Sequence, residues 1–181
     1  GRIRSIQKDN IKVQEVVIKR NKEENIIYIA SIQSENISVV TEVERKGNSI
    51  WIKKFSEQLP RLFCDFPLIG TEDFAFPAVV NSSKFNPTEP RNGIFLKDVD
   101  EAETNENKSL IEEAVKLYGE FLSYISNRGW KGIYNFVKIR SQGEKTWLSK
   151  EWVGKNIIDV CKTIICTTPI IDNKVETRTA L

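Results

Sequence analysis

The sequence contains no histidine and no methionine, and only 3 of its 181 residues are cysteine. Without histidine, the chain cannot form Ser-His or Cys-His nucleophile pairs, and most kinds of zinc site are excluded as well. The three cysteines are odd in number and lack metal-ligand spacing. Because Cys161 and Cys166 lie in an apolar stretch, we expect buried free thiols in a reducing, cytoplasmic setting. The missing methionine, with glycine at position 1, leads us to expect a piece of a longer protein.

Strong net charge and long apolar runs are also lacking. Lysine and arginine total 27 against 25 acidic residues, which leaves a formal net charge of +2. The basic residues are scattered rather than clustered, so the sequence offers no argument for nucleic acid as a partner. No apolar run approaches the length that crosses a membrane, so we expect no membrane partner either. The length fits one domain with a sizeable core, or slightly more.

The first half of the chain has the composition and the partial alternation of β-strands. Four segments rich in Ile and Val are separated by short polar breaks, which predicts an antiparallel meander with strands at 11–19, 26–33, 37–45 and 49–54. Further on, we expect two buried extended segments and a short strand at 62–69, 76–81 and 94–96.

After Asp98 the pattern becomes helical. A polar, acidic linker precedes a helix capped at Thr104 or Asn105, which Gly129 would end. Its apolar residues recur at helical spacing at Leu110, Ala114, Leu117 or Tyr118, Phe121 and Ile125. A shorter helix is predicted from Trp130, Ile133, Tyr134 and Val137. A third is capped by Ser149 and ended by Pro169, with one apolar face of Trp152, Val153, Ile157, Val160, Cys161 and Ile164.

Together these patterns predict an α+β fold. We expect a mostly antiparallel sheet in the N-terminal half, packed with about three helices from the C-terminal half. The predicted domain covers residues 1–165, with a β-rich part at 1–98 and a helical part at 104–165. Residues 166–181 would begin a following segment.

The segment from Leu59 to Asp98 holds all but one of the six prolines. Within it lies a polar loop, residues 82–93, of the composition in which rigid scaffolds commonly carry function. Pro87 and Pro90 restrict this loop, so it should be stiff. Arg91 would therefore stand at a defined place, directly before the Asn92-Gly93 turn signal.

Residues 66–96, FPLIGTEDFAFPAVVNSSKFNPTEPRNGIFL, resemble the segment that follows the ATPase domain in bacterial chaperone-like proteins of the GHKL ATPase superfamily. These proteins are relatives of the heat-shock-protein-90 chaperones and of the sacsin repeat. The resemblance covers roughly residues 59–140. It implies the middle, or transducer, region of such a protein. ATP and Mg²⁺ would be bound by an upstream ATPase domain of the same chain, and client proteins are possible further partners.

Nucleotide-binding motifs are absent from the chain itself. It contains no G-x-x-x-x-G-K-[ST], no G-x-G-x-x-G, and none of the pocket motifs of GHKL proteins, such as Asp-x-Gly-x-Gly. We therefore expect no cofactor site and no metal site within these residues. The fragment alone should neither bind nor hydrolyse ATP appreciably.

The resemblance also implies a role for a basic residue in the loop at 81–91. In GHKL ATPases, the middle region extends such a residue from a loop toward the terminal phosphate of the nucleotide. Arg91 is the first candidate, because its planar guanidinium forms paired hydrogen bonds to phosphate oxygens. Lys84 is the weaker candidate. The structural alternative is that Arg91 pairs with Glu89 or an aspartate and holds the loop.

Two other patterns have a chemical and a simpler structural interpretation. Paired acids among Asp65, Glu72 and Asp73 could perform general acid-base work on a glycoside. No sugar-stacking aromatic array accompanies them, and Glu72-Asp73 after Gly70-Thr71 more often means a turn or helix cap. Glu42, Glu44 and Lys46 alternate along one predicted strand, as in half of a metal-dependent nuclease site. The missing aspartate would have to be Asp9, so a solvated strand face is the simpler interpretation.

One alternative function needs no nucleotide at all. The helical half, with Trp130, Trp147, Trp152, Phe121 and Tyr134, would then bind a protein partner, and the chain would be an α+β interaction module. Aromatic residues at helical spacing are more often part of a core.

Overall fold

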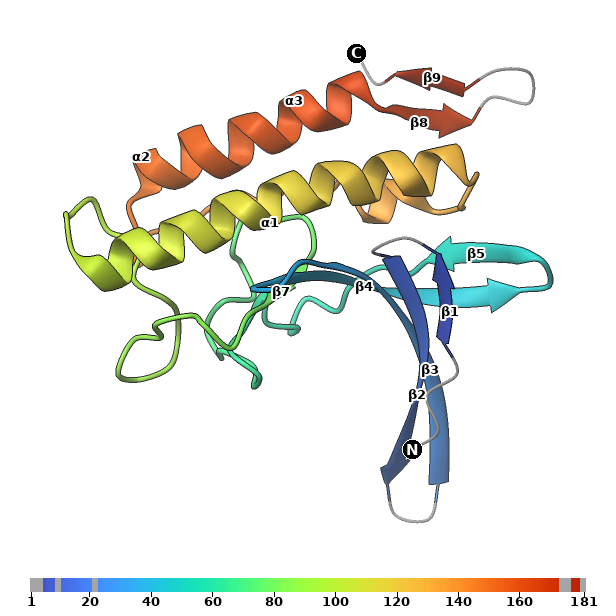
Figure 1. Ribbon diagram of the computed structural model, residues 1–181, viewed down its shortest axis with the longest axis horizontal. Helices are drawn as coiled ribbons and strands as arrows, with labels where there is room; N and C mark the ends of the chain where they lie inside the picture. Colours follow the sequence, from blue (N-terminus) through green and yellow to red (C-terminus); the bar gives the residue numbers. More distant parts are fainter. Residues whose placement is uncertain (1–4, 9–10, 21–22, 173–176, 180–181) are drawn as a thin grey trace.

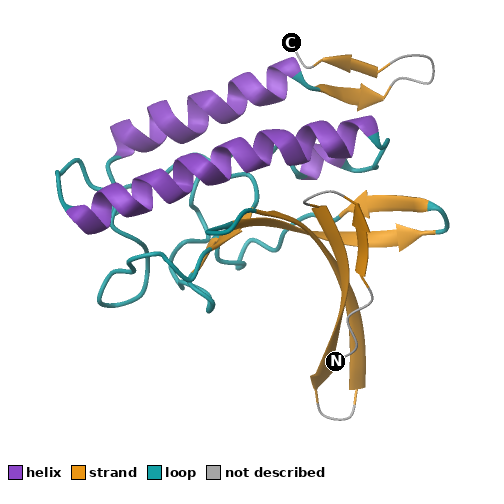
Figure 2. Ribbon diagram, viewed as in Figure 1, coloured by secondary structure: helices purple, strands orange, loops and turns teal. Residues whose placement is uncertain are grey.

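The structure is a computed structural model and describes residues 5–8, 11–20, 23–172 and 177–179. It contains a curved sheet and two long helical segments, and α1 lies between the sheet and the second helical segment (Figures 1 and 2). The strands are β1 Ser5–Lys8, β2 Ile11–Arg20, β3 Glu23–Gln33, β4 Ser38–Lys46, β5 Ser49–Ile52, β6 Leu62–Phe63, β7 Val79–Asn81, β8 Pro169–Asp172 and β9 Thr177–Thr179.

Seven of these strands form one sheet in the order β1-β2-β3-β4-β7-β6, with β5 also paired to β4. The pairs β1–β2, β2–β3, β3–β4 and β4–β5 are antiparallel neighbours in sequence, so the predicted meander is confirmed. The one parallel pair joins β6 to β7. Along β4 the side chains of Val39, Thr41 and Val43 are buried, and those of Val40 and Glu42 are less so, as expected for a sheet with one face on the core.

The proline-rich segment forms less strand than its apolar pattern predicted. Only Leu62–Phe63 and Val79–Asn81 are strands, and Ile94 and Leu96 form isolated bridges to Pro87 and Leu148. The physical reason is that Pro67 and Pro77 have no N–H to donate to a ladder, so strand pairing stops around them. The segment is nevertheless buried, and Leu62, Leu68, Phe74 and Phe76 are inaccessible or nearly so.

Helix α1 runs from Ala102 to Asn127, and its N-cap is Glu101. The predicted cap at Thr104 or Asn105 is therefore wrong. Thr104 is fully buried within the first turns of the helix and is unavailable as a cap. The predicted apolar face is confirmed from Leu110 to Ile125. The helix ends as expected, because Gly129 follows the C-cap with a φ of 65°.

The shorter helix predicted at 130–137 is replaced by one 3₁₀ turn, Ile133–Asn135 (η1). The backbone of Lys131 is already used by β5: Ile52 N donates to Lys131 O, and Lys131 N donates to Ile50 O, each at 2.9 Å. Gly132 has a φ of 71°, and a Cβ there would lie 2.7 Å from Ile52 O. Pairing with the sheet edge therefore outweighs local helix propensity. In the part of the C-terminal half that the structure describes, there are two long helical segments rather than three.

The second helical segment is continuous over residues 150–167. It consists of α2 Lys150–Val153, the π-helical turn η2 Gly154–Ile158 and α3 Asp159–Thr167. Ser149 caps it as predicted, because its hydroxyl accepts a hydrogen bond from Trp152 N at 3.2 Å.

The buried side of this second segment differs from the predicted face. Val153, Ile157 and Cys161 are buried, but Val160 is 40% exposed. The extra residue of the π turn changes which residues share a face, a shift that a regular period of 3.6 does not include. Cys166 is exposed, so the prediction of a buried thiol holds for Cys161 only. Burial raises the pKa of Cys161 to about 12, which keeps it an inert thiol.

One core joins the sheet, the proline-rich segment and both helical segments. At its centre the ring of Phe136 lies 5.1 Å from that of Tyr118 and 5.2 Å from that of Phe121. The Tyr118 hydroxyl donates to Phe136 O at 2.9 Å, which satisfies a fully buried group. Trp130 and Trp147 are buried as expected, whereas Tyr134 is 72% exposed. The α+β fold is confirmed. None of the helices in the described ranges has the length and apolarity to cross a membrane.

Candidate functional site

The loop that carries Arg91 is closed by its own backbone. Thr88 N donates to Gly93 O at 3.0 Å, Arg91 N donates to Thr88 O at 2.7 Å, and Pro87 is bridged to Ile94. Arg91 has a φ of 51°, in the left-handed region that side-chain-bearing residues rarely adopt. A non-glycine residue in this conformation is held by its surroundings, and such positions cluster at functional sites.

Helix α1 anchors this loop through a buried asparagine. Asn107 is inaccessible; its Oδ1 accepts a hydrogen bond from Asn86 N at 2.8 Å. Its Nδ2 donates to Asn86 O at 2.9 Å and to Phe95 O at 3.2 Å. These three hydrogen bonds hold both ends of the Arg91 loop against α1.

The side chain of Arg91 is exposed, and its guanidinium carbon lies 4.7 Å from the centroid of the Phe66 ring. Within the described residues it forms no ion pair with Glu89 or with any aspartate. The structure therefore does not contain the local ion pair that was the alternative role for Arg91. The cation rests on an aromatic face and keeps its charge available to solvent.

Lys84, the second basic candidate, lines a different hollow from the one that Arg91 lines. Its ammonium donates to Asn36 Oδ1, and the surrounding hollow also includes Glu106 and Glu113. Arg91 lines a separate hollow with Glu89 and Glu103. The two predicted site residues are thus not brought together in one pocket.

Two of the three carboxylates considered for glycoside chemistry have structural partners. Both oxygens of Glu72 accept from Gly70 N at 3.0 Å, and Asp73 pairs with Lys145 at 2.9 Å. Asp65 occupies a turn with a φ of 59°. These contacts are those of turns and surface pairs, in agreement with the simpler interpretation.

The nuclease pattern on β4 is also accounted for by local pairs. Glu44 pairs with Lys46 at 3.1 Å, and Glu42 pairs with Lys53. Asp9, the remaining residue of that hypothesis, lies outside the described residues. Among the residues that are described, no group of three or more His, Cys, Asp and Glu side chains could hold a metal ion.

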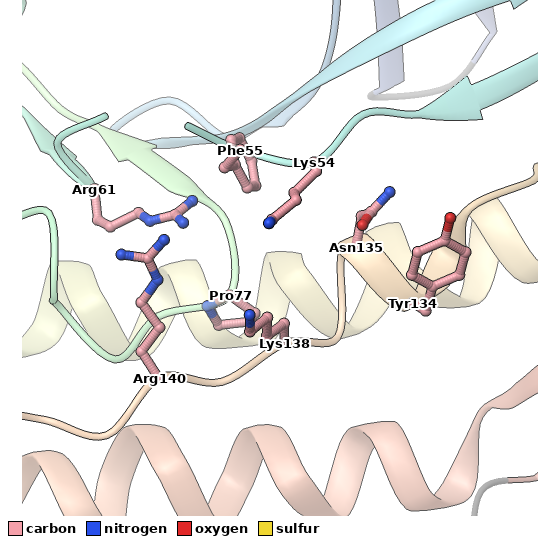
Figure 3. Close-up of a pocket in the computed structure, with 8 residues that line it drawn as sticks. All are labelled: Lys54, Phe55, Arg61, Pro77, Tyr134, Asn135, Lys138 and Arg140. Carbon is pink, nitrogen blue, oxygen red and sulfur yellow. The ribbon is translucent and has the colours of Figure 1, made fainter. Parts of the chain in front are cut away.

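A second candidate site is a pocket whose lining residues are far apart in the sequence. This pocket of about 260 Å³ lies where the segment after β5 meets the segments around β6 and η1 (Figure 3). Of the residues that the structure describes, four cationic ones and no carboxylate line it. The lining residues are Lys54, Phe55, Arg61, Pro77, Tyr134, Asn135, Lys138 and Arg140. Figure 3 shows the guanidinium groups of Arg61 and Arg140 facing each other, with Lys54 extending toward the same space.

Arg61 is the unusual member of this pocket, because it is only 5% exposed. Its Nε and Nη1 are buried without a hydrogen-bond partner, and its guanidinium carbon lies 4.3 Å from the centroid of the Phe55 ring. Burial, together with the charge of Arg140, lowers the pKa of Arg61 to about 10. Both effects mean that the folded chain disfavours this charge where it stands.

Backbone contacts explain why Arg61 stays there. Thr71, itself inaccessible, accepts hydrogen bonds at Oγ1 from Arg61 N and Leu62 N, each at 3.1 Å. Val80 N donates to Arg61 O at 2.8 Å. Arg140 is fixed separately, because its Nη1 donates to Glu72 O at 2.9 Å.

No family model, curated protein or solved structure matches this chain. Interpretation of both sites therefore depends on their own chemistry and, for Arg91, on the resemblance of the surrounding segment.

The sequence singled out Arg91 through its proline-rich context and the resemblance of the segment, and its role stays a prediction. The pocket around Arg61 was not predicted. One local signal was available: Lys138 and Arg140 are two residues apart, and residues at this spacing lie on the same side wherever the backbone is extended. Their approach to Arg61 depends on contacts between distant parts of the chain and leaves no trace in the sequence.

Proposed function

We propose that this chain is the middle, transducer-like region of a chaperone-like GHKL ATPase. In this proposal an upstream domain of the intact protein binds ATP and Mg²⁺, and Arg91 contacts the terminal phosphate. The observation that carries the proposal is the state of Arg91: an exposed guanidinium without a carboxylate partner in the described residues, held on a constrained loop.

The chemistry expected of Arg91 is positioning and charge stabilisation. The terminal phosphoryl group carries dispersed negative charge during transfer, and a fixed guanidinium offsets it without any covalent step. Because three hydrogen bonds tie the loop to Asn107, a shift of α1 would move Arg91 with it. This link offers a route by which the nucleotide state is passed from the loop to the helical half.

The test is the substitution Arg91→Ala in the intact protein. We expect ATP turnover to fall by about 10³-fold or more, as for other arginines that contact a transferring phosphoryl group, while nucleotide binding is retained. Arg45→Ala, which removes an exposed arginine from β4, is the matched control and should leave turnover unchanged. Equal turnover in the Arg91→Ala and wild-type proteins would remove Arg91 from the mechanism.

The alternative is an interaction module without a nucleotide role. The second helical segment supports it, because this segment forms the outer layer and presents Val160, which is 40% exposed. A protein partner would cover that side. The intact protein discriminates between the two functions: absence of ATP binding, with a partner lost on Val160→Asp, would favour the interaction module.

A further inference from the structure

The pocket around Arg61 is a second site, and it is far more basic than the chain as a whole. The whole chain is almost balanced, with 27 basic and 25 acidic residues. The pocket nevertheless gathers Lys54, Arg61, Lys138 and Arg140 without a carboxylate among its lining residues. None of the four forms an ion pair within the described part of the chain. Lys53, the neighbour of Lys54, does pair with Glu42, so carboxylates are within reach of this region and are absent from the pocket.

The buried state of Arg61 requires a compensating group. A buried charged side chain is normally paired and hydrogen-bonded, because burial removes the water that solvates the charge. Stacking on Phe55 recovers only part of that loss. The unpartnered Nε and Nη1, and the like charge of Arg140, leave the remainder uncompensated. An anion in the pocket would supply the missing negative charge beside the two guanidinium groups.

We propose that this pocket binds an oxyanion of the phosphate class. Two guanidinium groups facing one space suit the tetrahedral oxygens of a phosphoryl group, which arginine binds through paired hydrogen bonds. A dianion also offsets more of the four positive charges than a carboxylate does. The volume of about 260 Å³ lies below the roughly 300–1,000 Å³ of pockets for drug-sized ligands. The ligand is therefore small: inorganic phosphate, or the phosphoryl end of a larger molecule that extends into solvent.

This site is independent of the proposed role of Arg91. The two arginines line different hollows, and the phosphate proposal needs no upstream domain. Loss of one function by substitution should leave the other intact.

The experiment is titration of the 181-residue chain with inorganic phosphate by calorimetry, at constant ionic strength and with acetate as the monovalent comparison. We expect saturable phosphate binding and no comparable binding of acetate. Arg140→Gln should weaken phosphate binding by about tenfold or more, because it removes a charged hydrogen-bond donor. Arg45→Gln, which removes the same charge outside the pocket, should change the affinity by less than about twofold.

Parallel titration with ATP identifies the source of the phosphoryl group. Tighter binding of ATP than of phosphate, lost with Arg140→Gln, would assign a nucleotide phosphate; equal or weaker binding would assign free phosphate or a small ester. The proposal is overturned if phosphate binds no better than acetate. It is also overturned if Arg140→Gln and Arg45→Gln reduce the affinity equally.

Discussion

At the scale of single residues, Arg61 and Arg91 differ in how their charge is accommodated. Neither forms an ion pair with a carboxylate within the described residues. Arg91 is exposed and rests on Phe66, so water solvates its charge at little cost. Arg61 is 5% exposed and stacks on Phe55, so its charge is desolvated. An exposed cation can bind an anion without first losing a carboxylate partner. A buried, unpaired cation lowers the stability of the folded chain unless an anionic ligand binds beside it.

Gly93, two residues after Arg91, is required for packing. A Cβ at this position would lie 2.2 Å from Cε2 of Trp147, a ring that is itself buried. We predict that Gly93→Ala lowers the free energy of unfolding by about 1–3 kcal/mol, because the indole must move. Denaturant unfolding followed by tryptophan fluorescence measures this change.

Gly154→Ala is the matched control for that prediction. Nothing lies within 4 Å of a Cβ added at Gly154, and alanine in a helix is more stable than glycine by about 0.5–1 kcal/mol. We expect this variant to be as stable as the wild type or more so. If the two alanine variants lose equal stability, the contact with Trp147 is not what makes Gly93 necessary.

At the scale of elements, the molecule depends on loops that are anchored by buried polar side chains. The Arg91 loop is joined to α1 by Asn107, and the backbone of Arg61 is joined to its neighbours by Thr71. In both cases a short buried polar side chain bonds to backbone groups of a segment that is mostly irregular. Such bonds give irregular segments the rigidity of regular structure.

Asn107→Ala tests this anchoring. It leaves Asn86 N and Phe95 O without their partner, whereas Asn86 O keeps the hydrogen bond from Phe95 N at 3.4 Å. We predict a loss of about 2–3 kcal/mol in the free energy of unfolding. Hydrogen exchange of residues 86–95 should accelerate, because the loop loses its attachment to α1.

Asn105→Ala is the matched control, because it changes an exposed asparagine of the same helix that donates a hydrogen bond to Asp100. It should alter the free energy of unfolding by less than about 0.5 kcal/mol. Unchanged exchange in the Asn107→Ala loop would show that the backbone alone maintains its conformation.

At the scale of the whole molecule, the cationic pocket joins parts of the chain that are far apart in sequence. Lys54 follows β5, Arg61 precedes β6, and Lys138 and Arg140 follow η1. The pairing of Lys131 with β5 brings the last two residues to the first two. Folding therefore concentrates positive charge, and this concentration opposes stability until an anion is bound.

Arg61→Met tests whether that charge serves binding or folding. Methionine keeps an unbranched, apolar side chain beside Phe55 and removes a buried unpaired charge. We predict that in phosphate-free buffer the variant is as stable as the wild type, or more stable by about 1–4 kcal/mol. Added phosphate should raise the melting temperature of the wild type but not that of the variant. A variant that is strongly destabilised without phosphate would instead identify Arg61 as a structural residue.

The sequence by itself determined the α+β fold, the strand meander, the apolar face of α1 and the caps at Gly129 and Ser149. These features follow from local periodicity and from the conformational preferences of single residues, which act over a few positions of the chain. The sequence also singled out Arg91, whose context of prolines is local.

Only the tertiary structure decided the remaining features. Pairing of Lys131 with β5 replaced the helix predicted at 130–137, and a π turn changed the face of the second helical segment. Tertiary structure also decides that Arg61 and Arg140 line the same pocket. In each case the outcome depends on which distant backbone or side chain comes near. That competition is settled by packing of the whole molecule rather than by neighbours in the chain.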